Sequence, residues 1–222
     1  MDKEQIVDHF TKIYKTNYWN GIESKSGTGS DLIATATLIP HLIDLINNLE
    51  VKTMIDAPCG DFHWMKEVVD HLNVEEYFGM DVVPEMVAGL VEKYTNLEST
   101  PKRTFSRIDV VHDILPKCGV IFSRDCLVHF SYETAKQIMR NFIASGSEYV
   151  LMTTFLSEDR PYGDILDGQW RAINFQLKPF NFPEPERVII EGCMEDHYRW
   201  TDKSLGLWKL DTLKGFLDVV SE

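Results

Sequence analysis

The sequence predicts an α/β fold with a doubly wound, mainly parallel sheet. Short apolar runs alternate along the chain with amphipathic segments of helical length, the pattern of repeated strand–helix–strand units. The run at 118–123 is continuously apolar, as a strand buried on both faces requires. Two earlier runs end in an acid, Asp56 and Asp81. Because open α/β sheets bind ligands outside the carboxyl ends of their strands, both acids are expected at a ligand site.

The composition is that of a globular protein with one domain over residues 1–222. Hydrophobic residues make up 44% and aromatic residues 11% of the chain, enough to bury a single core. The formal net charge of −13 argues against nucleic acid or an anionic membrane surface as a partner. No apolar run approaches the length of a membrane span. We therefore expect a cytoplasmic protein with a small-molecule partner, and the oligomeric state stays open.

Metal-ligand spacing is missing from the sequence. The four cysteines include no Cys-x-x-Cys pair, which argues against a zinc site. Asp61, His63, Asp125 and His129 also follow no recognisable ligand spacing. No metal is expected.

Residues 1–50 are predicted to form an N-terminal helical segment. Apolar residues recur with a helical period over 2–15 and again over 31–48. Pro40 falls inside the second stretch and should kink or split that helix.

A loop rich in serine and glycine joins these two helices and contains Trp19 and Gly27. One interpretation is a flexible connector whose last residues cap the next helix. The other is a lid, in which Trp19 and the glycines close over a bound ligand.

The stretch 51–81 is predicted to be a strand–turn–helix–strand unit. Its first strand spans about 51–55, a tight turn follows, and a helix runs over about 62–72. The second strand ends at Asp81, whose two oxygens suit the two hydroxyls of a ribose. Alternatively, the strand-ending acids only cap the helices that follow.

The rest of the chain continues the alternation of strands and helices. Pro84 stands where a helix to about residue 94 would begin. Further strands are predicted at 105–110, 118–123, 148–154, 187–191 and 205–210, with helices at 132–144 and from 211 onward.

A long insertion at 156–187 follows the strand that ends at Thr154, and aromatic residues, prolines and arginines crowd it. Such insertions after strand ends often cover a substrate. We therefore predict that Thr154, Trp170 and Arg171 bind the substrate. Arg171 suits a carboxylate or phosphate group, and the alternative is that it pairs with a nearby loop acid.

Residues 56–61, Asp-Ala-Pro-Cys-Gly-Asp, resemble motif I of the class I S-adenosylmethionine-dependent methyltransferases. The usual motif has an acid and three alternating glycines. Gly60 matches fully, whereas Pro58 and Phe62 stand where the other two glycines occur. The resemblance extends over most of the chain. It implies a Rossmann-like, seven-stranded, mainly parallel sheet with an antiparallel last strand, and an enzyme that converts S-adenosylmethionine to S-adenosylhomocysteine.

The resemblance also implies roles for individual residues. Asp81 would hold the ribose, and Asp109 would accept a bond from the adenine amino group. The alternative for Asp109 is a loop acid in solvent. The full cofactor-binding set expected from the resemblance comprises Trp19, Gly27, Asp56, Ala57, Pro58, Gly60, Asp61, Asp81, Val82, Asp109, Val110 and Arg124. The alternative for Arg124 is that it pairs with an acid.

The end of the strand at 118–123 faces the acceptor in similar enzymes. His129 is the candidate base, because the pKa of an unperturbed imidazole lies near neutrality. Asp125 is predicted to be catalytic beside it, by orienting the imidazole. The alternative is that His129 only packs or positions the substrate. We expect methylation of an oxygen atom of a small molecule, with a sugar or a phosphoryl compound as a suggested acceptor.

Two other functions compete with methyl transfer. A non-catalytic nucleoside-binding domain would keep Asp56, Asp81 and Asp109 but would not need an acceptor pocket. A nicotinamide-dependent oxidoreductase would need Gly-x-Gly-x-x-Gly in the first turn, which residues 57–60 do not supply.

Overall fold

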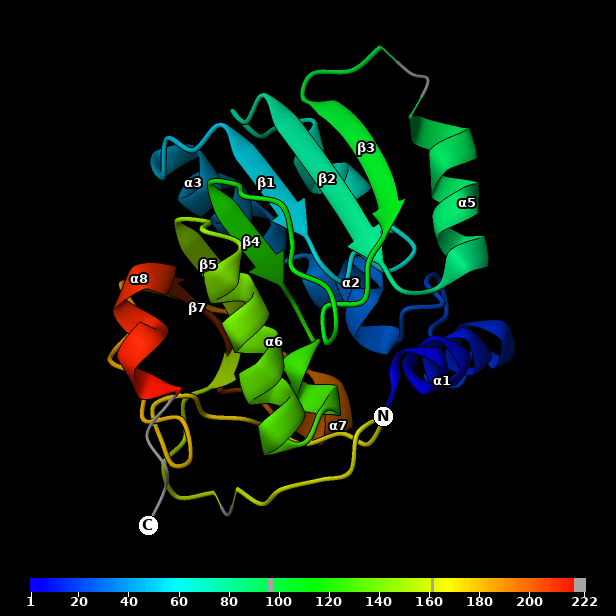
Figure 1. The fold of residues 1–222 in the computed structure, drawn as a ribbon. Helices are drawn as coiled ribbons and strands as arrows, with labels where there is room; N and C mark the ends of the chain where they lie inside the picture. Colours follow the sequence, from blue (N-terminus) through cyan, green and yellow to red (C-terminus); the bar gives the residue numbers. More distant parts are fainter. Residues whose placement is uncertain (96–97, 161, 218–222) are drawn as a thin grey trace.

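The computed structural model describes residues 1–95, 98–160 and 162–217. A seven-stranded sheet in the order β3-β2-β1-β4-β5-β7-β6 forms the centre of the molecule (Figure 1). β7 is antiparallel to both β5 and β6, and the remaining neighbours pair in parallel. This confirms the predicted fold class. The strands are β1 (Thr53–Asp56), β2 (Glu76–Asp81), β3 (Lys102–Arg107), β4 (Val120–Ser123), β5 (Tyr149–Phe155), β6 (Arg187–Ile190) and β7 (Lys203–Lys209).

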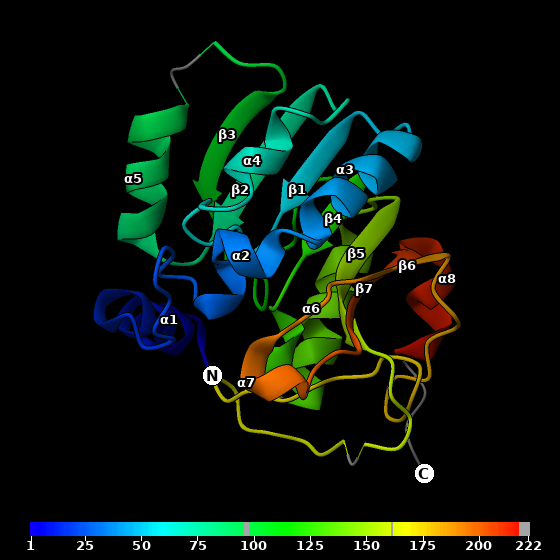
Figure 2. The ribbon, with the colours of Figure 1, turned by 180° about the vertical axis from the view of Figure 1, so that it is seen from behind.

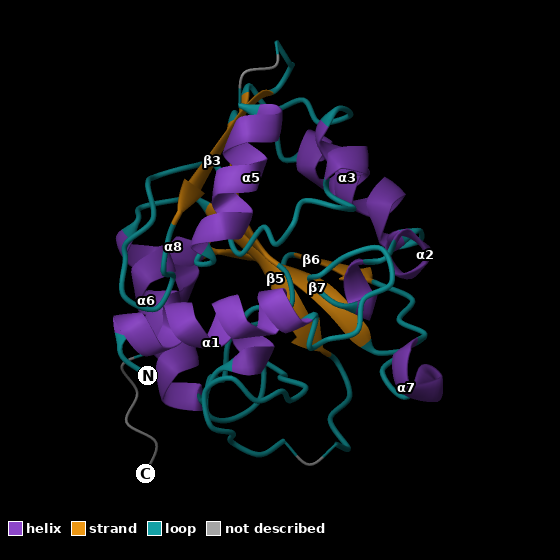
Figure 3. Cartoon of the chain, turned by 90° about the vertical axis from the view of Figure 1, so that its right-hand side faces the viewer, coloured by secondary structure: helices purple, strands orange, loops and turns teal. Residues whose placement is uncertain are grey.

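Helices cover both faces of the sheet, as apolar strands on two faces demand. One face carries α3 and α4, which lie in front of the sheet in Figure 2, and the other carries α6 and α8. Figure 3 shows α1 lying across the end of the sheet. The helices are α1 (Lys3–Thr16), α2 (Leu32–Thr35), α3 (Leu38–Asn48), α4 (Lys66–Val69), α5 (Pro84–Tyr94), α6 (Tyr132–Ala144), α7 (Glu195–Tyr198) and α8 (Leu210–Leu213).

Local signals set several helix boundaries where the sequence predicts them. α5 begins at Pro84, because proline needs no hydrogen bond at the first helical position. Ser131 caps α6 by accepting from the backbone N–H of Thr134. The second N-terminal helix is split into α2 and α3, and Pro40 lies in the first turn of α3, where its missing N–H costs no helical bond.

The helix predicted at 62–72 is much shorter than expected. Phe62 has a left-handed backbone with φ +59°, which a right-handed helix cannot include. Regular α-helix is confined to α4. The turn after β1 is therefore longer than the apolar pattern indicates, and its backbone borders the end of the sheet.

The insertion after β5 contains no helix or strand among its described residues, which are 156–160 and 162–186. Part of it is nevertheless core. Phe175 and Phe182 are buried against Trp208, and Phe180 packs on both of them. The indole N–H of Trp208 donates to the carbonyl of Pro183 at 2.8 Å. Only the remainder of the insertion is free to shape a ligand site.

Across the described residues, no helix has the length and apolar character needed to span a bilayer.

Candidate active site

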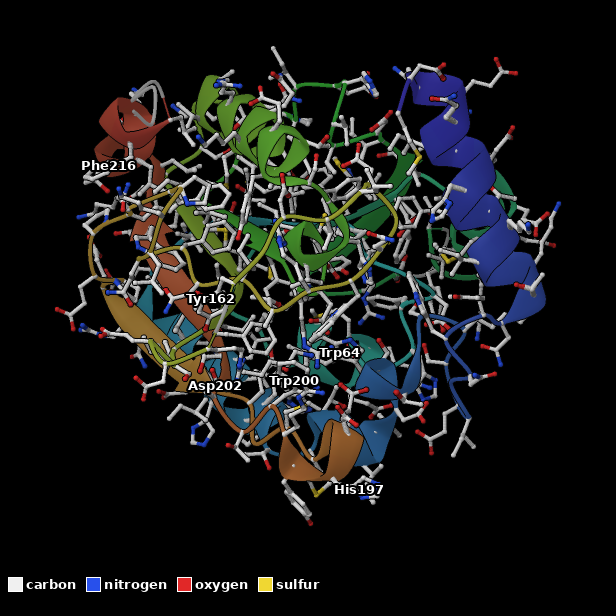
Figure 4. All side chains as sticks on the ribbon, turned by 90° about the horizontal axis from the view of Figure 1, so that it is seen from below. Trp64, Tyr162, His197, Trp200, Asp202 and Phe216 are labelled. Atoms are coloured by element: carbon white, nitrogen blue, oxygen red, sulfur yellow. The ribbon has the colours of Figure 1, made fainter. Side chains whose placement is uncertain are left out.

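A cavity of about 980 Å³ opens at the carboxyl ends of the parallel strands, within the size range of small-molecule sites. Figure 4 looks at the molecule from this side, and Trp64 and Trp200, which line the cavity, lie near the middle of the view. The cavity is also lined by every predicted cofactor-binding residue except Ala57. The predicted catalytic residues His129 and Asp125 line it as well.

Asp81 forms part of the cavity wall at the end of β2. One carboxylate oxygen accepts the backbone N–H of Gly60 at 3.0 Å, and the other accepts that of Val83 at 3.1 Å. Burial raises the pKa of Asp81 to about 6, against the opposing effect of the backbone N–H groups. The carboxylate is thus held rigidly between the first and second strand ends, and it is mostly ionised at neutral pH.

Asp56 ends β1 and lies deeper than Asp81. The hydroxyl of Tyr77 donates to its Oδ2 at 2.5 Å. Burial raises the pKa of Asp56 to about 8, so this carboxyl is mostly protonated at neutral pH. Ala57 follows it and does not line the cavity. Its side chain is fully buried, and its backbone N–H donates to the carbonyl of Phe122 at 2.9 Å.

Asp109 lies just past β3 and is 3% exposed. Its Oδ1 accepts the backbone N–H of Val111 at 2.9 Å, and its Oδ2 lies 2.7 Å from Nδ1 of His112. Asp109 therefore lines the cavity just past β3 with both carboxylate oxygens engaged.

The N-terminal segment closes over the turn after β1. Asp61 accepts from the Ser24 hydroxyl and from the Lys25 backbone N–H, both at 2.8 Å. A Cβ on Gly60, which has φ +55°, would lie 2.3 Å from the Ser26 hydroxyl oxygen. This close approach requires glycine at position 60 and places the loop directly on the turn. Asp31 is the N-cap residue of α2, but its carboxylate does not cap that helix; it accepts the backbone N–H groups of Glu23 and Ser24 in the loop at 3.0 and 3.2 Å.

Four charged side chains meet beneath the end of β4. Arg124 donates twice to one oxygen of Glu191, at 3.1 and 2.7 Å. Lys203 Nζ lies 2.6 Å from Oδ2 of Asp125 and 3.6 Å from Oε2 of Glu191. Burial alone would raise the pKa of Asp125, but the Lys203 and Arg124 cations lower it to about 2. Asp125 is therefore ionised and is a poor proton acceptor.

The ring of His129 contacts both the N-terminal segment and the insertion. Its ring stacks on Trp19, with centroids 5.0 Å apart and planes at 26°. Its Nδ1 lies 3.1 Å from the carbonyl oxygen of Gln169. Burial lowers the pKa of His129, and the nearby Asp125 carboxylate offsets part of that effect. The imidazole is therefore neutral at physiological pH and can accept a proton.

An aromatic wall, formed by Phe155, Trp170 and Trp200, lines the cavity at the insertion. The Trp170 and Trp200 rings are 4.7 Å apart in an edge-to-face contact, a favourable geometry for aromatic pairs. The guanidinium of Arg160 lies 4.6 Å over the Trp200 ring and pairs at 2.6 Å with Asp202, which lies beside Trp200 in Figure 4. The Arg160 cation thus packs against the aromatic wall and is itself held by Asp202.

Two of the predicted substrate-binding residues do not reach the cavity. Arg171 is 7% exposed, donates to the Leu127 carbonyl at 3.3 Å and lies 4.5 Å over the Tyr132 ring. Thr154 is buried, and its hydroxyl accepts the Phe175 backbone N–H at 3.5 Å. Both side chains serve packing of the insertion, so an anion-binding role for Arg171 is not supported. Trp170 does line the cavity.

Within residues 1–95, 98–160 and 162–217, no group of three or more His, Cys, Asp or Glu side chains is arranged to hold a metal ion.

Several solved structures with this architecture are methyltransferases. Magnesium protoporphyrin IX methyltransferase from Synechocystis PCC 6803 with bound S-adenosylmethionine aligns with a TM-score of 0.63 at 13% identity, over 94% of this chain and 97% of that one. The chain has the class I methyltransferase fold. Human N-acetylserotonin methyltransferase aligns with a TM-score of 0.60 at 13% identity, over 91% of this chain and 59% of that one.

A bacterial Hen1 methyltransferase domain shares this methyltransferase fold with a TM-score of 0.59 at 14% identity, over 78% of this chain and 96% of that one. No protein-family model matches the chain, and no curated protein sequence matches it.

The fold also brings cavity residues to the site that were not predicted from the sequence. β7 runs antiparallel, so its first residue, Lys203, lies at the edge where the parallel strands end. The prediction began this strand at 205 and so left Lys203 outside it. Glu195 and Trp200 also line the cavity and come from the segment before β7. The one sequence feature that could have indicated a site there is a Trp in a stretch without strand or helix periodicity.

Proposed function

We propose that this chain is an S-adenosylmethionine-dependent methyltransferase that methylates an oxygen atom of a small molecule. The observation that carries the proposal is the buried carboxylate of Asp81, fixed by Gly60 and Val83 beside the turn after β1, in a class I methyltransferase fold. A carboxylate at this place can accept both hydroxyls of a ribose.

The cavity residues fit such a cofactor. Asp81 and Asp109 line the part of the cavity formed by β2 and β3, where they would hold the ribose and the adenine amino group. Each oxygen of Asp81 accepts one backbone N–H and retains a lone pair for a ligand. When bound, S-adenosylmethionine supplies a methyl group carried by a positively charged sulfur, and the cavity's carboxylates suit that charge.

The same cavity continues past the cofactor region to His129 and the aromatic wall. A hydroxyl acceptor gains the methyl group and loses its proton, which a positioned base takes. His129 is the base in this proposal, because burial keeps it neutral. Asp125 stays ionised beside it and would stabilise the imidazolium that forms. The aromatic wall would bind the apolar face of the acceptor and exclude water.

Calorimetric titration tests the cofactor part of the proposal. S-adenosylmethionine and S-adenosylhomocysteine should bind with one site per chain, whereas NAD should not bind. Binding of NAD in their place would contradict the assignment. Release of S-adenosylhomocysteine is then measured with a panel of hydroxylated, amine and thiol acceptors. Cofactor binding without release from any acceptor class would instead favour a non-catalytic nucleoside-binding domain.

A further inference from the structure

The backbone of the insertion is bonded to the loop that carries His129. The N–H of Gly168 donates to the His129 carbonyl at 2.7 Å, and the N–H of Arg171 donates to the Val128 carbonyl at 3.0 Å. Between these two bonds, the Gln169 carbonyl oxygen lies 3.1 Å from Nδ1 of His129. Three contacts therefore fix one short stretch of the insertion against both the backbone and the ring of His129.

The contact with Gln169 determines which ring nitrogen carries the proton. A backbone carbonyl can only accept a hydrogen bond, so Nδ1 must donate and must be protonated. In a neutral imidazole the other nitrogen, Nε2, then has a free lone pair. The stack on Trp19 holds the plane of the ring, which leaves Nε2 as the proton-accepting atom.

We propose that the insertion acts on the reaction through His129, with the Gln169 carbonyl fixing the Nδ1–H tautomer and Gly168 as the positioning residue that makes this contact possible. The proposal rests on the proposed function, in which His129 is the base. It gives the stretch around 168–171 a role other than binding the acceptor directly, and it accounts for the position of Arg171 away from the cavity.

Gly168 is required for two independent reasons. Its backbone has φ +90°, a region that residues with a side chain rarely adopt. A Cβ at this position would also lie 2.4 Å from Nε2 and 2.6 Å from Cε1 of His9 on α1. A side chain here would have to displace the insertion from α1, and the Gln169 carbonyl would move with it.

The charged and titratable groups around His129 agree with this role. Asp125 favours the charged imidazole, whereas Lys203 from β7 and His9 from α1 disfavour it, and burial has the largest effect. When Nε2 takes the acceptor's proton, the imidazolium keeps its Nδ1–H bond to Gln169. The proton then leaves from Nε2 to solvent, and the original tautomer is restored without rotation of the ring.

Nitrogen-15 NMR of the histidine-labelled protein reads the tautomer directly, and it needs neither cofactor nor acceptor. The His129 resonances are assigned by their loss in His129→Gln. Above the pKa of the imidazole, Nδ1 should carry the proton and Nε2 should not. A wild-type spectrum with the proton on Nε2 would overturn the proposal even if every variant misfolded.

Gly168→Ala is compared with Gly163→Ala, a substitution in the same insertion where a Cβ would meet nothing within 4 Å. Gly168→Ala should mix the two tautomers, lower kcat by about tenfold or more and shift the acidic limb of the kcat–pH profile, with cofactor affinity within about twofold of wild type. Gly163→Ala should match wild type throughout. Equal tautomers and pH profiles in both variants would refute the role of Gly168. Failure of the proposed function is seen separately, as absent cofactor binding despite the expected tautomer.

Discussion

The indole of Trp19 and the imidazole of His129 stack with their centroids 5.0 Å apart, although 110 positions separate them in the sequence. Trp19 belongs to the N-terminal segment, and His129 ends a short 3₁₀ helix after β4. The N-terminal segment and the candidate base are therefore in direct contact.

Trp19→Ala should lower kcat/KM by about tenfold, since an aromatic pair is worth about 0.5–1.5 kcal/mol beyond its area. Cofactor affinity should fall less than kcat/KM, because the loop at 24–26 stays bonded to Asp61. Tyr18→Ala is the matched control, since Tyr18 is 70% exposed, and it should behave as wild type. Steady-state rates of S-adenosylhomocysteine release measure both variants. Unchanged kinetics in Trp19→Ala would show that the stack of Trp19 on His129 does not contribute to the reaction.

Asp81→Ala should weaken S-adenosylmethionine binding by at least about tenfold. Each hydrogen bond that it would make to the ribose is charge-assisted and worth about 1.5–3 kcal/mol. Asp44→Ala, which removes an exposed acid on α3, controls for the loss of one negative charge. Titration calorimetry gives both affinities, and circular dichroism verifies the fold. Equal affinity in the two variants would end the ribose assignment.

The buried carboxyl of Asp56 should make the stability of the folded chain depend on pH. Its pKa is raised by burial from the usual 3.8 to about 8 in the folded chain. Between these values the unfolded chain has released a proton that the folded chain retains, so the free energy of unfolding falls as pH rises from about 4 to about 8. Asp56→Asn can still accept from Tyr77 and does not titrate.

The stability of Asp56→Asn relative to wild type should therefore increase across this window, by on the order of a few kcal/mol. Urea unfolding at intervals between about pH 4 and pH 8 measures the difference. A difference that stays constant with pH would mean that Asp56 is ionised in the folded protein.

Glu191→Ala should destabilise the fold by about 3–5 kcal/mol, because it leaves the buried Arg124 without its main partner. The carboxylate of Glu191 is 2% exposed and accepts both Arg124 bonds. Glu186→Ala breaks only the half-exposed pair with Lys209 and should cost no more than about 1 kcal/mol. Denaturant unfolding compares the two variants. A similar small loss in both would show that the charged cluster adds little stability.

The parts of the fold that could be predicted from the sequence are those set by interactions between residues close together in the chain. Proline at the start of α5 and serine before α6 act within one helical turn, so those boundaries are readable. The helix expected at 62–72 failed because Phe62 takes a left-handed conformation. A hydrophobic pattern carries no information about the sign of a backbone φ angle.

The candidate site divides in the same way. The strand-ending acids Asp56 and Asp81 are predictable, because the position of a strand end fixes where its last residue lies. The direction of the Arg171 side chain could not be predicted, because an irregular segment has no periodic pattern that separates buried from exposed positions. The structure shows the guanidinium packed on the ring of Tyr132. The partnership of Arg124 with Glu191 joins residues 67 positions apart, and no local pattern reports it.

The sheet order has a consequence for how the chain folds during synthesis. β7 lies between β5 and β6, so β6 cannot join the sheet until residues 203–209 have left the ribosome. Glu195, which accepts the Thr28 hydroxyl 167 positions away at 2.6 Å, also emerges late. Contacts between such distant residues are slow to form. The part of the cavity wall that Glu195, Trp200 and Lys203 contribute is therefore the last to be synthesised.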